Sequence, residues 1–473
     1  MVGNENGSAF PNGFLFDQAR NSCPKGFIEG PLLPGLFLDP MSWVSTAEDN
    51  QSGKFVLIIG TCKFLSGKEN VARELVEVFS QEREEGLLKS LDNLVGRYVI
   101  LFGSRKDIYV VGDATSMRPV FYADGGGAIA SHAALLAGRE TGAEEILDFP
   151  FSSSFPGNFT PYKGVRILPP NFTLELATAK LQRFWPLAPI EQNSTERAAS
   201  RVLDLSTKSW KALTEDRDVW AALTAGLDSR VMLAVALNAG GHLKAFTYGS
   251  NRGTYVDRKV AAQMGKRFGF QHFEVATERP SGELKSALAR AHFWDHHWSA
   301  VGPLRQLIAN PNAAVLSANI LEIGQSNFRK LQWNGGVEEP KTAEQMATVY
   351  HRKLSKNAKT QVENYGKSKY MEEVAAYFQK LIDDTGGPSE FLDPFDEYYW
   401  SIRMGTWHGP SSVEKDFYGE PLNPFNNRRI IETLLSVSKA DQYDLSVFLR
   451  LITMVNCELL DMPINPSSVP PSW

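Results

Sequence analysis

The sequence has little cysteine and no surplus of basic residues. Of its 473 residues, 3 are cysteine, at positions 23, 62 and 457. An odd number of scattered cysteines argues against a disulfide framework or a thiolate metal site, and it is typical of a reducing compartment. Lys and Arg total 49 against 54 Asp and Glu, which gives a net charge of -5. This balance provides no general attraction to nucleic acids or anionic membranes.

Long apolar runs are also missing. No uninterrupted apolar stretch approaches the length of a membrane-spanning helix. The start, MVGNENGSAF, has neither the basic region nor the apolar core of a signal peptide. We therefore expect a cytoplasmic protein with no membrane and no nucleic-acid partner. At 473 residues and 43% hydrophobic content, the chain is long enough to bury large cores in two or three domains.

The residue pattern changes near residue 190. Short β-rich segments separated by turns fill residues 55–132, and an amphipathic helical segment at 69–91 interrupts them. This pattern predicts an α+β domain with antiparallel strands over residues 1–190. Residues 186–194, PLAPIEQNS, are rich in Pro and lack periodicity, so the domain boundary is placed there.

Strands and helices alternate after this boundary. Apolar strand-like segments lie at 219–223, 242–250, 272–276 and 312–318, with helical patterns between them. The alternation predicts a parallel sheet with helices on its faces. From residue 342 onward the pattern is mostly helical. We thus expect an α/β domain with a helical C-terminal part over residues 191–473.

One strand of this expected sheet ends in an unusual break, WAALTAGLDSRVML, at residues 220–233. Ligands of parallel sheets bind where strands end and helices begin. Gly226 allows close approach of the backbone, and the N–H groups at a helix start favour an anion. Thr224 and Ser229 can donate to phosphate oxygens, whereas Asp228 would act through a magnesium ion. The alternative is that Asp228 and Ser229 merely cap a helix.

The segment LTAGLDSR, at residues 223–230, resembles the SGGxDS signature of the N-type ATP pyrophosphatases, and its surroundings resemble the asparagine synthetase family. Residues 246–272 are similar to the family's second strand and following helix. LSANILEIGQSNF, at 316–328, resembles a segment that usually reads LSGxGADELFGGY. Residues 421–435 resemble the family's R-x-PFLD helix entry, and residues 96–123 resemble its glutaminase-like region.

The resemblance implies a fold and a reaction. Residues 1–190 would form an Ntn-hydrolase-like, degenerate glutaminase domain, and residues 191–473 a synthetase domain of the adenine nucleotide α-hydrolase-like type. The implied enzyme is an ATP-dependent, AMP-forming carbon–nitrogen ligase with ATP and Mg²⁺ as cofactors. A small-molecule or peptide carboxylate would attack the α-phosphate, and a substrate amine would then displace AMP. A homodimer is left open.

The resemblance also implies the site residues. Asp228 and Glu322 would hold magnesium, although an exposed loop position is the alternative for Glu322. Asp257 matches a family acidic position, yet Thr254-x-x-Asp257 forms a capping box, and we favour the cap. The residues expected to bind the nucleotide are Leu223, Thr224, Ala225, Gly226, Leu227, Asp228, Ser229, Arg230, Phe246, Thr247, Tyr248, Gly249 and Ser317.

The chain departs from the family pattern at several positions. Glutamine-hydrolysing members carry a cysteine directly after the initiator methionine, where this chain has Val2. Because ammonia release from glutamine needs that thiol and its terminal amine, we expect the nitrogen to come from a substrate amine, as in β-lactam synthetases and lasso-peptide cyclases. Ala225 replaces the first Gly of SGGxDS, and Ile323 replaces the Glu of GADEL.

No residue matches the lysine that the family places late in the chain to stabilise charge in the transition state. Arg403, Lys439 and Arg428 are candidate substitutes, each also explicable as a solvated or structural charge. Arg403 and Lys439 are taken as the catalytic candidates beside Asp228 and Glu322. This gap and the altered acidic pair keep a non-catalytic nucleotide-binding homologue open as an alternative. An ammonia-dependent asparagine synthetase is the other alternative.

A histidine-rich segment, HFWDHHW, lies at residues 292–298. His292 and His296 are one helical turn apart, a spacing that can ligate zinc. The sequence places no further ligand beside them, whereas tetrahedral zinc sites need three or four protein ligands. A general-base or pocket-wall role for His296 or His297 is therefore favoured over a metal site.

Overall fold

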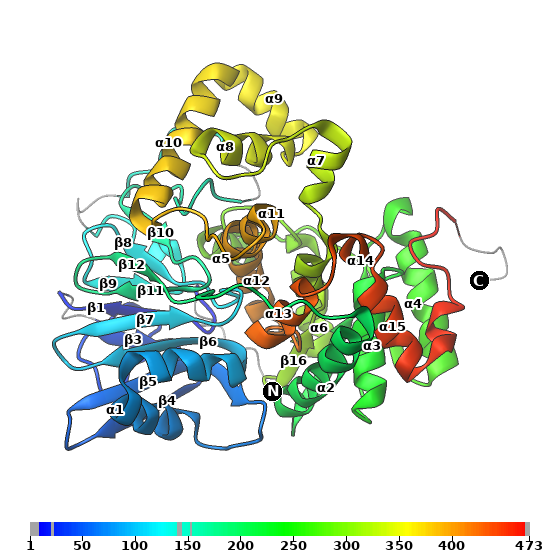
Figure 1. Ribbon diagram of the computed structural model, residues 1–473, viewed down its shortest axis with the longest axis horizontal. Coiled ribbons are helices and arrows are strands. Elements are labelled where there is room, and N and C mark those ends of the chain that lie inside the picture. Colours follow the sequence, from blue (N-terminus) through cyan, green and yellow to red (C-terminus); the bar gives the residue numbers. More distant parts are fainter. Residues whose placement is uncertain (1–8, 20–22, 140–143, 152–153, 469–473) are drawn as a thin grey trace.

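The computed structural model describes residues 9–19, 23–139, 144–151 and 154–468. Val2, from which we expect that the nitrogen comes from a substrate amine, lies outside these residues. Figure 1 shows two stacked antiparallel sheets on one side and a parallel sheet among helices on the other. None of the helices in these ranges is both long and apolar enough to cross a membrane.

The first part of the chain forms two six-stranded antiparallel sheets. The first has the order β10-β8-β9-β1-β3-β2, with β1 (Phe14–Asp17), β2 (Ile28–Glu29), β3 (Leu36–Leu38), β8 (Phe121–Ala123), β9 (Ala128–Ala130) and β10 (Val165–Ile167). The second has the order β12-β11-β7-β6-β5-β4, with β4 (Val44–Asp49), β5 (Lys54–Phe64), β6 (Leu94–Gly103), β7 (Ile108–Gly112), β11 (Phe172–Glu175) and β12 (Lys180–Arg183).

The sequence of β5 explains why these sheets form layers. Successive side chains of a strand point to opposite faces. Phe55 and Leu57 face the first sheet, while Val56 and Ile58 pack beneath helix α1 (Val71–Ser90). Both faces of the second sheet are therefore buried. The expected α+β pattern of antiparallel strands interrupted by one helix is confirmed.

The second part of the chain forms a five-stranded parallel sheet in the order β15-β14-β13-β16-β17. Its strands are β13 (Asp218–Ala222), β14 (Lys244–Tyr248), β15 (Gln271–Val275), β16 (Ala313–Leu316) and β17 (Glu420–Leu422). The first four confirm the predicted strands, and β17 was not expected. One face packs against α2 (Thr195–Thr214), α3 (Leu227–Asn238), α4 (Tyr255–Phe268) and α15 (Ser446–Val455), and the other against α6 (Trp298–Ile308).

The strand order determines where a ligand can bind. From β13 the chain moves outward through β14 and β15, and it then returns to the opposite side of β13 with β16. The connections after β13 and β16 therefore diverge at the carboxyl edge of the sheet. Such a topological switch point leaves a crevice outside the strand ends. The residues that follow β13 lie at this point.

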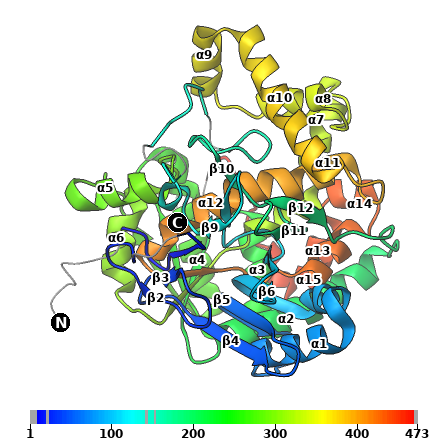
Figure 2. The ribbon, with the colours of Figure 1, turned by 90° about the vertical axis from the view of Figure 1, so that its left-hand side faces the viewer.

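The remaining helices connect and flank these layers. In both views, α8, α9 and α10 project from the sheets (Figures 1 and 2). The short elements that surround the sheets are η1 (Leu91–Asn93), η2 (Ala133–Leu135), η3 (Arg252–Thr254), η4 (Asn319–Gln325), η6 (Val413–Phe417) and η7 (Cys457–Leu460). The helices are α5 (Gly282–Ala291), α7 (Arg329–Gly335), α8 (Ala343–Arg352), α9 (Lys356–Tyr365), α10 (Lys367–Thr385), α11 (Pro394–Glu397), the π-helix η5 (Tyr398–His408), α12 (Gly409–Ser412), α13 (Arg428–Leu435) and α14 (Lys439–Tyr443).

A buried polar joint connects the two parts. The side-chain amide of Asn426 donates to the Gly96 carbonyl oxygen at 2.7 Å and to Asp113 Oδ1 at 2.9 Å. The Thr115 hydroxyl donates back to Asn426 Oδ1 at 3.0 Å. The adjacent Asn427 donates to two carbonyl oxygens that precede and begin β6. The segment that resembles the R-x-PFLD helix entry therefore docks onto the antiparallel sheets.

A buried ion pair extends this joint. The guanidinium of Arg97 in β6 binds both carboxylate oxygens of Asp416 in η6 at 2.8 Å. Both side chains are 2% exposed. The indole N–H of Trp400, in η5, also donates to the Ala114 carbonyl oxygen at 2.7 Å. Satisfied polar contacts in a dry interface fix its register, because any slip leaves buried groups without partners.

A buried histidine makes the folded state sensitive to acid. Burial, together with nearby Arg97 and Arg118, lowers the pKa of His132 to about 3. The unfolded chain has a histidine pKa of about 6.5, so between these values the unfolded state binds a proton that the folded state does not. Stability is therefore lost as the pH falls below 6.5, with a slope of up to about 1.4 kcal/mol per pH unit for this group.

We expect His132→Asn to reduce this acid sensitivity, because asparagine does not titrate. The thermal midpoint of the variant will fall less than that of the wild type between pH 7 and pH 5, as measured by circular dichroism. The matched control is His242→Asn, since His242 is exposed. An equal fall in the wild type and in His132→Asn would contradict the expectation.

Candidate functional site

The loop between β13 and α3 folds around its own hydroxyl groups. The backbone N–H of Thr224 donates to Ser229 Oγ at 3.2 Å, and that of Gly226 donates to Thr224 Oγ1 at 3.1 Å. The Ser229 hydroxyl lies within 3.3 Å of the carbonyl oxygens of Thr224 and Gly226. Thr224 is exposed and Gly226 is half-buried. The loop therefore presents a compact polar surface at the start of α3.

Asp257 supports this loop from the neighbouring helix. Its Oδ1 accepts a hydrogen bond from the Ala225 N–H at 2.8 Å. Thr254 makes no side-chain cap bond to α4, so the predicted capping box is wrong. The side chain of Asn251 caps the preceding turn instead. The local sequence favoured the cap. The sheet, however, brings the start of α4 beside the loop, and Asp257 accepts from the Ala225 N–H instead.

The side chain of Arg230 connects the loop to the C-terminal segment. It is fully buried, and its guanidinium donates to the carbonyl oxygens of Leu459 at 2.9 Å and Met462 at 2.5 Å. It also donates to the carbonyl oxygens of Ala225 and Pro463. The guanidinium predicted to bind nucleotide is thus directed into the C-terminal segment, where main-chain oxygens occupy it.

The residues predicted from β14 have separate positions. Phe246 is buried in the core that faces α6, and the Tyr248 ring lies 5.2 Å from that of His297. The Thr247 hydroxyl donates to the Leu223 carbonyl oxygen at 2.5 Å, which ties β14 to the loop. Gly249 has a φ of +141°, and a Cβ there would lie 2.2 Å from the Thr254 hydroxyl. Gly249 therefore accommodates the close turn into α4.

Two further predicted residues lie at the same edge. Leu227 is 7% exposed and packs in the large core, so it anchors the start of α3. Ser317 directly follows β16, which pairs with β13. Its hydroxyl is buried and has no hydrogen-bond partner among the described residues. An unpartnered hydroxyl beside the loop is available to a bound ligand.

The structure brings Asp228 and Glu322 together. Burial and, second, the charge of Glu322 raise the pKa of Asp228 to about 7, while a hydrogen bond from Gln325 acts in the opposite direction. Gln325 Nε2 donates to Asp228 Oδ1 at 2.5 Å, and the Tyr399 hydroxyl donates to Glu322 Oε2. Glu322 is half-buried, so it is not the exposed loop residue of the alternative interpretation.

These carboxylates are a suitable donor set for magnesium. Mg²⁺ prefers oxygen ligands, and one or two carboxylates together with phosphates are its usual site in proteins. The bond from Gln325 places the Asp228 carboxylate beside η4, the element that also carries Glu322. A divalent cation would compensate both charges. The residues present therefore fit the ion that the sequence predicts.

A family comparison identifies the segment that carries the loop. Residues 201–293 match the family model described as asparagine synthase. We refer to residues 201–293 as the asparagine synthase segment. No curated protein matches the chain in a sequence comparison. The asparagine synthase segment contains β13, α3, β14, α4 and β15, and hence both the loop and Asp257.

Solved structures resemble the chain over parts of its length. NMN synthetase from Francisella tularensis has 14% identity and a TM-score of 0.21, over 29% of this chain and 59% of that chain. Glutamine PRPP amidotransferase from B. subtilis has 12% identity and a TM-score of 0.20, over 60% and 59% of the two chains. NH3-dependent NAD synthetase from Campylobacter jejuni has 11% identity and a TM-score of 0.21, over 42% and 100%. The chain thus spans 59% of the NMN synthetase that it matches.

Beyond the asparagine synthase segment, cationic groups lie near Glu322. The guanidinium of Arg403 lies 4.0 Å from the centre of the Trp407 ring, and burial lowers its pKa. The ammonium of Lys353 lies 4.6 Å from the centre of the buried Phe328 ring. Partial burial and the charge of Arg403 lower the pKa of Lys353, while Glu322 raises it. Arg403 and Lys353 therefore place positive charge near a carboxylate of the site.

The other two predicted cationic residues, Lys439 and Arg428, make structural contacts. Lys439 forms an ion pair with the buried Asp396, whose pKa burial raises to about 6. Arg428 is buried, and its Nε donates to Asn171 Oδ1 at 3.1 Å. Sequence reasoning named Lys439 and missed Lys353 and Tyr399. No local signal marks Lys353, because its contact with the Phe328 ring depends on how the end of α8 packs against the residues after η4.

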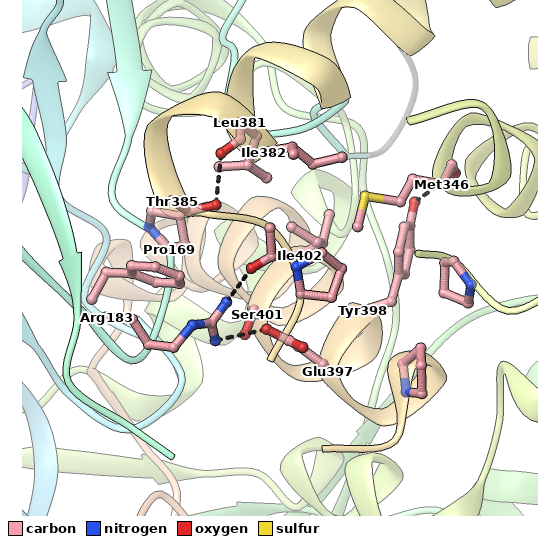
Figure 3. Close-up of a pocket in the computed structure, with 15 residues that line it drawn as sticks. Pro169, Arg183, Met346, Leu381, Ile382, Thr385, Glu397, Tyr398, Ser401 and Ile402 are labelled. Atoms are coloured by element: carbon pink, nitrogen blue, oxygen red, sulfur yellow. Dashed lines mark hydrogen bonds and ion pairs between the residues drawn. The ribbon is translucent and has the colours of Figure 1, made fainter. Parts of the chain in front are cut away.

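A separate cleft lies between the antiparallel sheets and the helical part (Figure 3). Arg183 Nη1 pairs with Glu397 Oε1 at 2.7 Å, and Nη2 donates to the Gly387 carbonyl oxygen at 2.8 Å. Tyr398 lines this cleft and also the one that contains Lys353. The ion pair between Arg183 and Glu397, drawn as a dashed line in Figure 3, connects β12 to α11 and so serves the packing of these elements.

We expect Asp257→Ala to loosen the loop, because the Ala225 N–H then loses a charged acceptor that contributes about 1.5–3 kcal/mol. Hydrogen–deuterium exchange of peptides that cover residues 223–229 will accelerate about tenfold or more. Asp204→Ala, at an exposed aspartate on α2, is the control and will leave this exchange unchanged. Equal exchange in the wild type and Asp257→Ala would contradict the supporting role.

Proposed function

We propose that this protein is an ATP-dependent, AMP-forming ligase that joins a carboxylate to an amine on a substrate. One observation carries the proposal. A polar loop of an asparagine synthase segment lies at the switch point of a parallel sheet, beside a coupled pair of carboxylates. We further propose that residues 1–190 form a degenerate glutaminase-like, Ntn-hydrolase-type domain. Residues 191–473 would form the synthetase domain, of the adenine nucleotide α-hydrolase-like type.

The loop would bind the phosphates of ATP. The first N–H groups of α3 have no partner within the helix, and the positive end of the helix dipole lies there. Together they favour a phosphate at the helix start. Thr224 is exposed, and the hydroxyl of Ser317 lacks a partner in the described structure. The main chain of Phe246 to Gly249 would line the adenine pocket.

Asp228 and Glu322 would hold a magnesium ion that neutralises the phosphates and the departing pyrophosphate. The hydrogen bonds from Gln325 and Tyr399 orient these carboxylates. Orientation by neighbouring donors fixes the geometry of metal ligands. Because Asp228 and Glu322 come from different connections of the sheet, the site forms only when β13 and β16 are paired.

The carboxylate substrate would attack the α-phosphorus and displace pyrophosphate, giving an acyl-adenylate. The substrate amine would then add to the acyl carbon, and expulsion of AMP would complete the amide. Both steps develop negative charge on oxygen atoms. Lys353 and Arg403 supply positive charge near Glu322, and preorganised charge of this kind stabilises such transition states. Lys353 therefore replaces Lys439 as the preferred counterpart of the family lysine.

The experiment is a pyrophosphate-release screen over carboxylic acids and amines, with AMP and the amide product identified by mass spectrometry. We expect Asp228→Asn to lower the release at least about 100-fold for every active pair, because the phosphate charge is no longer compensated. The control is Asp204→Asn. Formation of ADP in place of AMP would overturn the mechanism. Turnover of aspartate with ammonium alone would identify an ammonia-dependent asparagine synthetase.

We expect Lys353→Met to lower turnover about 100-fold, the size of effect seen when one preorganised donor is removed. Lys439→Met will mainly lower the thermal midpoint, because Asp396 is left buried without its cationic partner. Lys356→Met, at an exposed lysine at the start of α9, is the control. Loss of turnover in Lys439→Met with full activity in Lys353→Met would contradict the assignment.

A further inference from the structure

Two histidines and a buried glutamate converge outside the loop site. His296 and His297 lie in the connection between α5 and α6, and Glu414 lies in η6, more than a hundred residues later. One ligand atom from each of the three side chains lies within 4.8 Å of the others. The sequence placed His292 beside His296, but His292 instead bonds the Trp294 carbonyl oxygen through Nδ1 at 2.6 Å.

The contacts inside this cluster leave ligand atoms unused. His296 Nδ1 lies 3.4 Å from Glu414 Oε1, and apart from this contact neither atom has a hydrogen-bond partner in the described structure. The other carboxylate oxygen, Oε2, accepts the His297 backbone N–H at 3.3 Å. The two imidazole rings are 3.9 Å apart between centres. All three side chains thus converge without saturating one another.

Burial makes an unsaturated carboxylate costly. The Glu414 side chain is 1% exposed, whereas that of His296 is 28% exposed. A buried carboxylate is stable when a cation or several donors compensate its charge. His296 and His297 are partly exposed, so one side of the cluster reaches solvent. An ion that entered beside His296 would meet imidazole nitrogen first and carboxylate oxygen behind it.

We propose that His296, His297 and Glu414 bind one Zn²⁺ ion, separate from the magnesium pair. Two imidazoles and one carboxylate are zinc ligands, whereas Mg²⁺ prefers an all-oxygen set. In a tetrahedral zinc site the ligand atoms are about 3.3 Å apart, as follows from bonds of about 2.0–2.1 Å. The cluster must therefore contract by up to roughly 1.5 Å, which rotation of the two half-buried histidines permits.

The site would keep an open coordination position. Three protein ligands are typical of zinc sites in which water or substrate occupies the fourth place. The ring of Tyr248, at the carboxyl end of β14, lies 5.2 Å from that of His297. The zinc ion would thus lie next to the strand whose main chain is proposed to line the adenine pocket. The zinc proposal does not rest on the ligase proposal, because the two donor sets share no residue.

The test uses the full-length protein without an affinity tag, stripped with a chelator. We expect one equivalent of Co²⁺ to give the intense visible absorption of a four-coordinate site, and one equivalent of Zn²⁺ to displace it. His296→Asn, His297→Asn and Glu414→Gln will each lose this absorption. Each will also weaken Zn²⁺ binding at least about tenfold, because one of the three protein ligands is removed. His242→Asn, at an exposed histidine, will keep both signals.

Folding and function are separated by two further measurements. The histidine variants replace half-buried side chains, so their retained circular dichroism decides the result if Glu414→Gln fails to fold. Asp228→Asn will bind Co²⁺ as the wild type does, whatever its effect on pyrophosphate release. The proposal is overturned if the wild type binds no Co²⁺ or Zn²⁺, or if folded His296→Asn and His297→Asn bind both ions as tightly as the wild type.

Discussion

The joint around Asn426 is the constraint on which the rest of the molecule depends. This buried amide binds Asp113 and the Gly96 carbonyl oxygen, and it accepts from Thr115. All of these groups are removed from water, so an alternative register would leave several of them without partners. The joint consequently fixes the segment that contains β17 and α13 against the antiparallel sheets. These polar contacts fix the register of the two parts, which also share apolar contacts such as that between the Trp185 and Trp400 rings.

The joint positions the elements that carry the side chains of the candidate site. Helix α13 follows Asn427 directly, and its Leu434 packs against Gly324 of η4, the element that carries Glu322. The Trp400 bond to Ala114 likewise fixes the π-helix that carries Arg403. Carboxylates and cations of the site are thus positioned through contacts with the antiparallel sheets. Those sheets contribute to the site without supplying one of its proposed catalytic side chains.

Much of the fold follows from local periodicity. The alternation in β5 and the apolar strands of the parallel sheet were predictable, because side-chain period and turn residues act over a few positions. The strand β17 was missed, since Glu420–Leu422 is too short for a pattern and gains its partner, β16, across a hundred residues. The joint was also hidden. In the sequence, Asn426 and Asn427 are indistinguishable from ordinary loop residues. Their hydrogen-bond partners lie on the antiparallel sheets, far away along the chain.

The sequence by itself determined the loop at residues 223–229, because a break between a strand and a helix is a local feature. It also placed the helix start near Asp228, which lies in the first turn of α3. Tertiary structure alone decided that Asp257 supports the loop, that Lys353 lies near Glu322, and that Glu414 meets the histidines. The physical reason is that these contacts join residues from separate elements. Their energies depend on burial and on partners that pairing and packing supply, and no spacing along the chain encodes them.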